Sequence, residues 1–234
     1  MAGPGDRTGF ANLIGGLMGG RRGRRVDRAP HLNHITAAYG QRVRRFGPNA
    51  QGVCWADGDG QTLRFELLLR VVDPADARAG FTVADYGCGY GALFTYLDDD
   101  PGLNVTGYVG YDMCPEMVHT ARAQVRDPRA RFVFADRMNR AADYAFASGT
   151  FNLCLGSDPE GWNHYVKAGI QHLWAHAAKG MAFNMLDHHT PGPMDGLYYA
   201  DPDEFVDFCA QHLSPRVELI PRDALPDWTI LVRR

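Results

Sequence analysis

The stretch VADYGCGYGALF, residues 83–94, runs from apolar residues into a cluster of glycines. Phe81, Val83 and Ala84 are typical of a buried strand, and the glycines after them let the backbone turn sharply and approach a ligand closely. Three glycines in five positions are more than a tight turn requires. We therefore predict a strand, a ligand-binding loop and a helix here, which is the repeating unit of a parallel α/β sheet.

The glycines fit two cofactor loops. Counted from Gly87, they satisfy the dinucleotide fingerprint G-x-G-x-x-G/A, which Ala92 completes. Counted from Asp85, they spell D-x-G-x-G-x-G, which suggests a different adenosine-bearing ligand. The Asp85 carboxylate would repel a pyrophosphate but attract an ammonium or sulfonium group, so it favours S-adenosylmethionine over NAD(P). Asp112, at the expected end of the next strand, suits either ligand because an acid there can bind both ribose hydroxyls.

Apolar runs and helical patterns alternate along the chain, which is typical of a parallel sheet covered on both faces. Strands are expected over residues 81–86, 106–112, 131–135, 142–148, 180–185, 215–220 and 228–233. Helices are expected over residues 31–46, 62–72, 91–98, 114–126, 162–178 and 202–213. The last two strands are joined too closely for a parallel crossover, so they should pair antiparallel. The pattern predicts a doubly wound, mostly parallel, seven-stranded Rossmann-like sheet with a C-terminal antiparallel hairpin.

Start and stop signals delimit two of these helices. Asp73-Pro74 is expected to end the helix over 62–72. Asp201, Pro202 and Glu204 have the spacing of a helix N-cap, a first helical residue and the reciprocal acid of a capping box. We therefore expect Asp201 and Glu204 to satisfy backbone donors at the start of the last helix.

Composition narrows the class of protein. The chain of 234 residues is long enough for one sizeable α/β domain. It contains no apolar run of about 18 residues that would suggest a membrane span, and its formal net charge of −3 disfavours broad nucleic-acid binding. The five cysteines are scattered, without zinc-ligand spacing, so we expect reduced thiols, a cytoplasmic location and no metal. Residues 1–28 are expected to form a flexible Gly/Arg-rich leader.

From His31 onward the chain resembles the class I S-adenosylmethionine-dependent methyltransferases. VADYGCGYGALFTYL is similar to the first motif of that family, YVGYDMCPEMV to its second-strand motif and RFVFAD to its third. ADYAFASGTFN resembles the fourth strand, and the helices before the first motif resemble those of small bacterial members. The resemblance implies a methyltransferase domain over 29–234, divided into N-terminal lid helices at 29–78 and a Rossmann-like core at 79–234.

The resemblance also implies roles for individual residues. Asp85 would lie near the cofactor ammonium and Asp112 would bind the ribose hydroxyls, while Asp136 would accept from the adenine amino group. Arg64 would meet the methionine carboxylate, and Tyr39 would close over it. The remaining positions implied to contact S-adenosyl-L-methionine are Gly87, Cys88, Gly89, Met113, Ser148 and Gly149.

The sequence says less about the molecule that accepts the methyl group than about the cofactor. Base-modifying relatives carry an N/D-P-P-Y/F tetrapeptide after the fourth strand, and this chain has Ala-Ser-Gly-Thr-Phe there. We therefore expect a small-molecule acceptor, methylated on O or N within secondary metabolism, by a monomer or homodimer. His188 and His189 are candidate general bases after the fifth strand. An NAD(P)-dependent oxidoreductase, an RNA or protein methyltransferase and a catalytically silent binding protein remain as alternatives.

Overall fold

The computed structural model describes residues 30–55 and 57–234. The expected Gly/Arg-rich leader at 1–28 lies outside the described residues. One mixed sheet has the strand order β3-β2-β1-β4-β5-β8-β7, with β6 paired to β5. The strands are β1 (Phe81–Tyr86), β2 (Val105–Asp112), β3 (Ala130–Phe134), β4 (Ala142–Ala147), β5 (Ala177–Asp187), β6 (Tyr199–Ala200), β7 (Val217–Ile220) and β8 (Asp227–Arg233). The predicted path of seven strands is confirmed, and the two-residue strand β6 is an addition to it.

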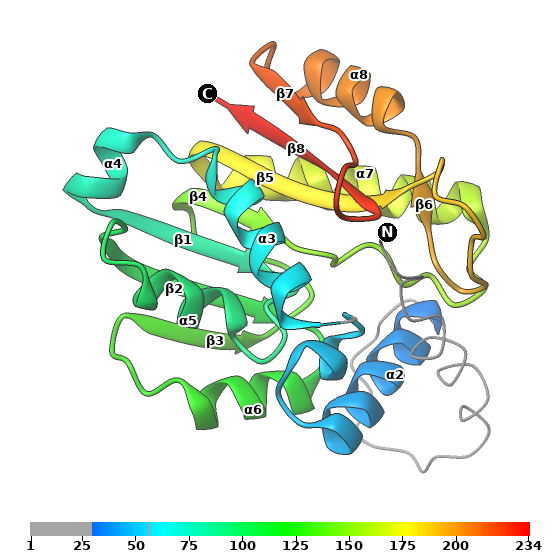
Figure 1. The fold of residues 1–234 in the computed structure, drawn as a ribbon, viewed down its shortest axis with the longest axis horizontal. Helices are drawn as coiled ribbons and strands as arrows, with labels where there is room; N and C mark the ends of the chain where they lie inside the picture. The colour runs from blue at the N-terminus through cyan, green and yellow to red at the C-terminus, as the bar shows by residue number, and fades with distance from the viewer. Residues whose placement is uncertain (1–29, 56) are drawn as a thin grey trace.

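Helices cover both faces of the sheet (Figure 1). They are α2 (Pro30–Phe46), η1 (Ala50–Val53), α3 (Gly58–Leu69), α4 (Pro74–Ala79), α5 (Ala92–Asp99), α6 (Pro115–Gln124), α7 (Pro159–His176) and α8 (Pro202–His212). Apolar residues of α7 and α8 join one core cluster, and those of α3, α5 and α6 join a second cluster across the sheet. The helix α2 lies at the end of the sheet toward which β1 and β2 point (Figure 1).

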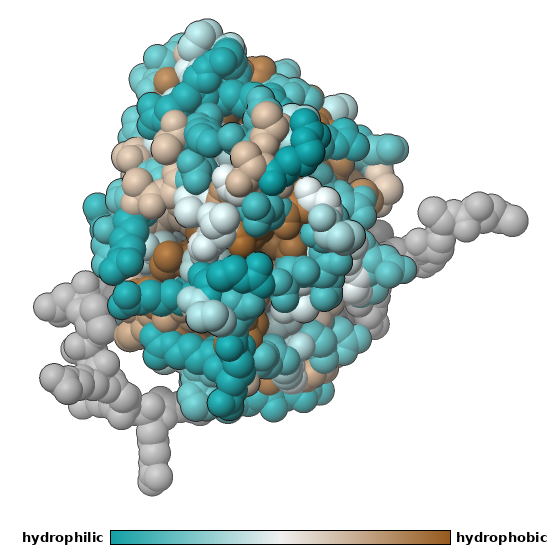
Figure 2. Space-filling model, turned by 90° about the vertical axis from the view of Figure 1, so that its left-hand side faces the viewer, coloured by the Kyte–Doolittle hydropathy of each residue, from teal (hydrophilic) through white to brown (hydrophobic). Residues whose placement is uncertain are grey.

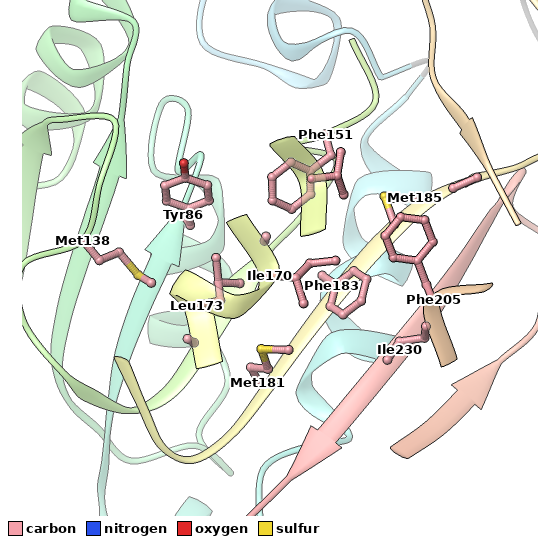
Figure 3. Packing of buried hydrophobic residues seen from close by; sticks show 14 of the residues in the cluster. Tyr86, Met138, Phe151, Ile170, Leu173, Met181, Phe183, Met185, Phe205 and Ile230 are labelled. Atoms are coloured by element: carbon pink, nitrogen blue, oxygen red, sulfur yellow. The ribbon is translucent and has the colours of Figure 1, made fainter. Parts of the chain in front are cut away.

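Nearly continuous burial of the central strands explains why they form the middle of the sheet. In β4, Ala145, Phe146 and Ala147 are all fully buried, as is typical of a parallel strand covered on both faces. Figure 3 shows part of this core, in which Ile170 of α7 lies beside Phe183 of β5. This core fixes the register of the strands and therefore the positions of the loops that follow them.

The order of the strands reverses at β1, and the direction of the strands reverses at β8. Strand β1 pairs parallel with β2 on one side and with β4 on the other. Successive connections therefore wind to opposite sides of β1, and the crevice at such a switch point lies beyond the carboxyl ends of β1 and β4. Farther along, β8 runs antiparallel to both β5 and β7, which confirms the predicted C-terminal hairpin.

Two local expectations are confirmed only in part. The pair Asp73-Pro74 starts a helix as well as following one: the Asp73 side chain accepts from the Ala75 amide at 2.7 Å, and Pro74 is the first residue of α4. In α8, the Asp201 side chain caps the helix by accepting from the Asp203 amide at 2.9 Å.

Among the described residues, Glu204 does not form the other half of that capping box. Its carboxylate accepts instead from Asn163 and Lys167 on α7, so a tertiary contact replaces the local one.

Figure 2 views the side on which the parallel strands begin, opposite to the switch-point crevice. Hydrophilic side chains rim this face, with hydrophobic residues visible between them (Figure 2). Among the helices at 30–55 and 57–234, none has the length and apolar character needed to cross a bilayer.

Candidate functional site

The loop after β1 forms the floor of the crevice. Gly87, Gly89 and Gly91 have φ values of 80°, 55° and 90°, which glycine adopts without steric cost. A Cβ at Gly87 would also come within 2.5 Å of the Thr150 hydroxyl oxygen. The amides of Gly87 and Cys88 both donate to the Tyr111 carbonyl, at 2.8 and 3.1 Å. The loop is therefore tied to the end of β2, and its first glycine is required by both conformation and space.

The larger of two adjoining cavities lies above this loop. Its walls come from the ends of β1, β2, β3 and β4, and from α2, η1 and the segment after η1. The residues that line it are Ile35, Tyr39, Val53, Trp55, Tyr86, Gly87, Gly89, Tyr111, Asp112, Met113, Met117, Ala135, Asp136, Ser148, Gly149 and Thr150. The cavity thus brings together predicted site residues from loops that are far apart in the sequence.

The two acids of the larger cavity stand on neighbouring strand ends. Asp112 accepts from the Gly89 amide through Oδ2 at 2.9 Å and from the Cys114 amide through Oδ1 at 2.7 Å. These bonds fix the carboxylate at the cavity wall. Asp136 follows β3, and its backbone carbonyl accepts from the Tyr86 hydroxyl at 2.9 Å. The pair could bind hydroxyl or amino groups of one ligand.

A smaller cavity continues past the loop toward α3. It is lined by Val53, Trp55, Gln61, Phe65, Asp85, Gly87, Cys88, Gly89, Tyr90, Ala92, Leu93 and Ser148. Asp85 is 3% exposed and accepts a hydrogen bond from the Tyr108 hydroxyl. Burial raises the pKa of Asp85 to about 7, the bond from Tyr108 opposes that rise, and the charge of Asp112 adds to it. A cationic ligand group at this carboxylate would favour its ionised form.

The end of β4 borders both cavities. Ser148 lines each of them, and its hydroxyl oxygen is buried without a hydrogen-bond partner among the described residues. The Gly149 amide donates to the Asn184 side-chain oxygen at 2.6 Å, which links β4 to β5 at this point. Tyr39 closes the larger cavity from α2, and burial raises the pKa of its hydroxyl well above the usual value, so it stays neutral. An unpartnered hydroxyl at such a junction is available to a ligand.

Arg64 has a different partner from the one expected. Its guanidinium forms a buried ion pair with Asp227 at the start of β8, and its Nη1 donates to the Gly60 carbonyl at 2.8 Å. Its Cζ lies 3.8 Å from the centroid of the Trp55 ring. Arg64 lines neither cavity. Both its charge and its flat face are thus used within the protein, and the structure gives no support for a direct contact with a ligand carboxylate.

His188 and His189 lie at the carboxyl end of β5, outside both cavities. Their Nδ1 atoms are 3.7 and 3.1 Å from one carboxylate oxygen of Asp187, and the two rings are 3.8 Å apart between centroids. The three donor atoms lie within 4.8 Å of one another, a separation that a shared metal ion could bridge. Arg222 Nε approaches Asp187 at 3.5 Å, which disfavours a further cation. Neither histidine therefore lines the two cavities that contain the predicted cofactor residues.

Several wall residues were not among the predicted cofactor-binding positions, notably Val53, Trp55, Gln61 and Tyr90. Gln61 accepts from the Tyr90 hydroxyl at 2.8 Å. The start of α3 did have a local signal: Asp57 caps the helix through the Gly60 amide, so α3 begins at Gly58 and not at the expected residue 62. Trp55 has no comparable signal, since its position depends on contacts with distant segments.

Comparisons with known proteins agree on the family. A family model described as "Methyltransferase domain" matches residues 83–182. "Putative methyltransferase Rv1506c" of Mycobacterium tuberculosis (strain ATCC 25618 / H37Rv) is 40% identical over 169 residues, which cover 71% of this chain and 99% of that protein. The likeness is high enough, and covers enough of that relative, to establish membership of the same family.

Solved structures show the same fold. Magnesium protoporphyrin IX methyltransferase from Synechocystis PCC 6803, with bound SAM, has a TM-score of 0.52 at 14% identity, covering 97% of this chain and 92% of that one. The DhpI–SAM–HEP complex has a TM-score of 0.61 at 13% identity, covering 89% and 100%. Human N-acetylserotonin methyltransferase with SAM has a TM-score of 0.57 at 17% identity, covering 89% and 60%. Together with the family match, the Rossmann-like fold and the D-x-G-x-G-x-G loop, these likenesses lead to one conclusion: the chain belongs to the class I S-adenosylmethionine-dependent methyltransferases.

Proposed function

We propose that this methyltransferase transfers a methyl group to an oxygen or nitrogen of a small molecule, with secondary metabolism as the expected setting, and that it does so as a monomer or homodimer. The proposal rests on four residues that cover the larger cavity and are called its roof below. Ile35, Tyr39, Val53 and Trp55 all come from the segments before β1 and cover the cavity with mostly apolar groups. None of these four residues is basic, and the exposed Arg44 and Arg45 of α2 do not line the cavity, whereas a nucleic acid is bound mainly through its phosphates by exposed basic side chains.

The described residues fit S-adenosyl-L-methionine by three independent observations. The cradle at Gly87 has no room for a Cβ, the Ser148 hydroxyl has no hydrogen-bond partner among the described residues, and at least one carboxylate lines each cavity. We propose that Asp112, Met113 and Asp136 hold the adenosine part, with Tyr39 over it. Asp85, with the backbone of Gly87, Cys88 and Gly89, would hold the amino-acid part, and Ser148 and Gly149 would lie between the two.

When bound, the cofactor supplies an electrophilic methyl group on a sulfonium. The leaving thioether needs no acid, so the protein's task is to orient the acceptor and exclude water, a proximity effect. The backbone of the glycine loop and the aromatic roof serve this task. For an acceptor that must lose a proton, we propose His188 and His189 as the base from the acceptor side, because they follow β5 at the same edge of the sheet.

We further propose that residues 29–78 act as a lid on the core formed by residues 79–234. The helix α2 and the η1 segment supply the roof described above, while the sheet and the glycine loop supply the floor. A lid of this kind would admit the cofactor and then shield the reacting groups from water.

The acceptor class can be tested by following release of S-adenosylhomocysteine. Purified protein and S-adenosylmethionine are incubated with the low-molecular-weight fraction of a cell extract, with total RNA or with total protein. We expect turnover with the small-molecule fraction alone, and the same turnover after deletion of residues 1–28. Turnover confined to RNA or protein, and dependent on those 28 residues, would refute the small-acceptor proposal.

A further inference from the structure

Five residues are shared by the two cavities: Val53, Trp55, Gly87, Gly89 and Ser148. The larger cavity holds Asp112 and the smaller one holds Asp85. A ligand that reaches both carboxylates must therefore pass these five residues. Trp55 is the one shared residue with a large aromatic side chain, and it comes from the N-terminal segment rather than from the core.

The Trp55 indole is pressed against the end of β4. A Cβ at Gly149 would come within 2.2 Å of Trp55 Cζ2 and 2.5 Å of Cη2, so the edge of the indole occupies the space that a side chain would need. The backbone of Trp55 and of the residue before it is also constrained. The Trp55 amide donates to the Ala50 carbonyl at 2.8 Å, and Cys54 before it has a φ of 68°, a left-handed conformation that non-glycine residues adopt at a cost.

A buried ion pair supports the indole from behind. The Arg64 guanidinium carbon lies 3.8 Å from the ring centroid, within the range of a cation–π contact. The side chains of Arg64 and Asp227 are 6% and 1% exposed, so neither moves freely. Arg64 Nη1 is held by the Gly60 carbonyl, which fixes the plane of the guanidinium. A chain of contacts thus runs from β8 through α3 to the indole and on to Gly149.

We propose that Trp55 contacts the bound cofactor where the two cavities meet, and that Arg64 and Asp227 are positioning residues that hold the indole there. This inference rests on the cofactor placement given under the proposed function. It gives the Arg64–Asp227 pair a role in ligand binding that neither residue could play directly, since neither lines a cavity. It also gives a function to an ion pair whose burial requires both charges to lose their hydration.

The first arm of the test compares two tryptophans. Trp174 on α7 is a matched control, because the Arg234 guanidinium carbon lies 4.1 Å from its ring centroid and it lines neither cavity. Trp55→Phe and Trp174→Phe are titrated with S-adenosylhomocysteine, following tryptophan emission and calorimetric heat. We expect Trp55→Phe to lose the ligand-induced emission change and to bind about threefold to tenfold more weakly, whereas Trp174→Phe keeps both wild-type responses.

The second arm addresses the positioning pair. Removing one charge would leave its partner buried and unpaired, so the variant is Arg64→Met/Asp227→Leu, in which both charges are replaced by apolar groups. Arg64→Lys is a second variant, which keeps the charge but not the flat guanidinium. With far-UV circular dichroism as for wild type, we expect both to bind S-adenosylhomocysteine about tenfold more weakly, with an altered Trp55 emission.

The outcomes separate this inference from the proposed function. Wild-type binding with an emission change that survives Trp55→Phe would overturn the contact. Wild-type affinity and emission in both Arg64 variants would overturn the positioning role. Failure of the wild type to bind S-adenosylhomocysteine would overturn the cofactor placement and this inference together.

Discussion

At the scale of single residues, Asp85 is the most consequential group in the smaller cavity. It is buried beside Tyr108, and burial raises its pKa to about 7. In the empty protein, a carboxyl group with a raised pKa stabilises the fold while it is protonated. That contribution is fully present below the unfolded pKa and is lost as the pH rises through about 7. A ligand ammonium reverses the preference, because it favours the ionised carboxylate.

This reversal predicts a pH dependence of ligand binding. Below pH 7, S-adenosylhomocysteine must displace a proton from Asp85, so its affinity should fall by up to about tenfold per pH unit. Calorimetric titrations between pH 5.5 and 8.5 would measure this dependence. Asp85→Asn cannot ionise and should bind weakly with a flat profile. A wild-type profile as flat as that of the variant would show that Asp85 does not meet the ammonium.

At the scale of elements, the contacts that position the site differ in range. The glycine loop and the acid at the end of β2 are local features, and both were predictable because a strand, its turn and its helix lie within one stretch of sequence. The partner of Arg64 was not predictable, since Asp227 lies 163 residues away on the last strand. Trp55 was not predicted as a cofactor-binding residue for the same reason: its place depends on Arg64 and Gly149.

The helices show the same division between local and tertiary signals. The Asp201 cap was predictable from adjacent residues, but the Glu204 carboxylate accepts a hydrogen bond from Lys167 of α7 and does not close the capping box. Strand β6 arises within a glycine-rich loop because Leu186 and Asp187 of β5 offer it an edge. No sequence pattern in that loop predicts a strand.

The cap of α8 gives a prediction at this scale. Asp201→Ala removes the acceptor for the Asp203 amide and should lower the free energy of unfolding by about 1 kcal/mol. Asp207→Ala, an exposed change in the middle of the same helix, is the control and should alter it by less than about 0.5 kcal/mol. Urea denaturation of the two variants would compare them, and equal effects would refute the capping role.

At the scale of the whole molecule, the Arg64–Asp227 pair joins the segment before the sheet to its last strand. Both side chains are buried, and burial raises the pKa of Asp227 even though Arg64 opposes that rise. The pair therefore connects α3, whose Arg64 supports the roof residue Trp55, to the C-terminal hairpin. Its loss should affect both global stability and the closure of the cavity.

Arg64→Met should lower the free energy of unfolding by about 3 kcal/mol, because it leaves a buried, unpaired carboxylate. The exposed pair Arg44–Glu116 is a control, and Arg44→Met should cost less than about 1 kcal/mol. Denaturant titrations would measure both changes. A cost for Arg64→Met as small as that of Arg44→Met would show that the buried pair does not bind the two ends of the domain together.

Asp112 is the residue that we propose as the main anchor of S-adenosylmethionine, at the end of β2. Asp112 also orders the loop through the Gly89 amide, so its loss removes a ligand contact and a support of the cradle. Isothermal titration of S-adenosylhomocysteine into the wild type and Asp112→Ala is the most direct measurement. We expect one site per chain in the wild type and a loss of affinity of about 100-fold or more in the variant, as for hydrogen bonds to a charged group. No binding by the wild type, or equal binding by the variant, would contradict the account.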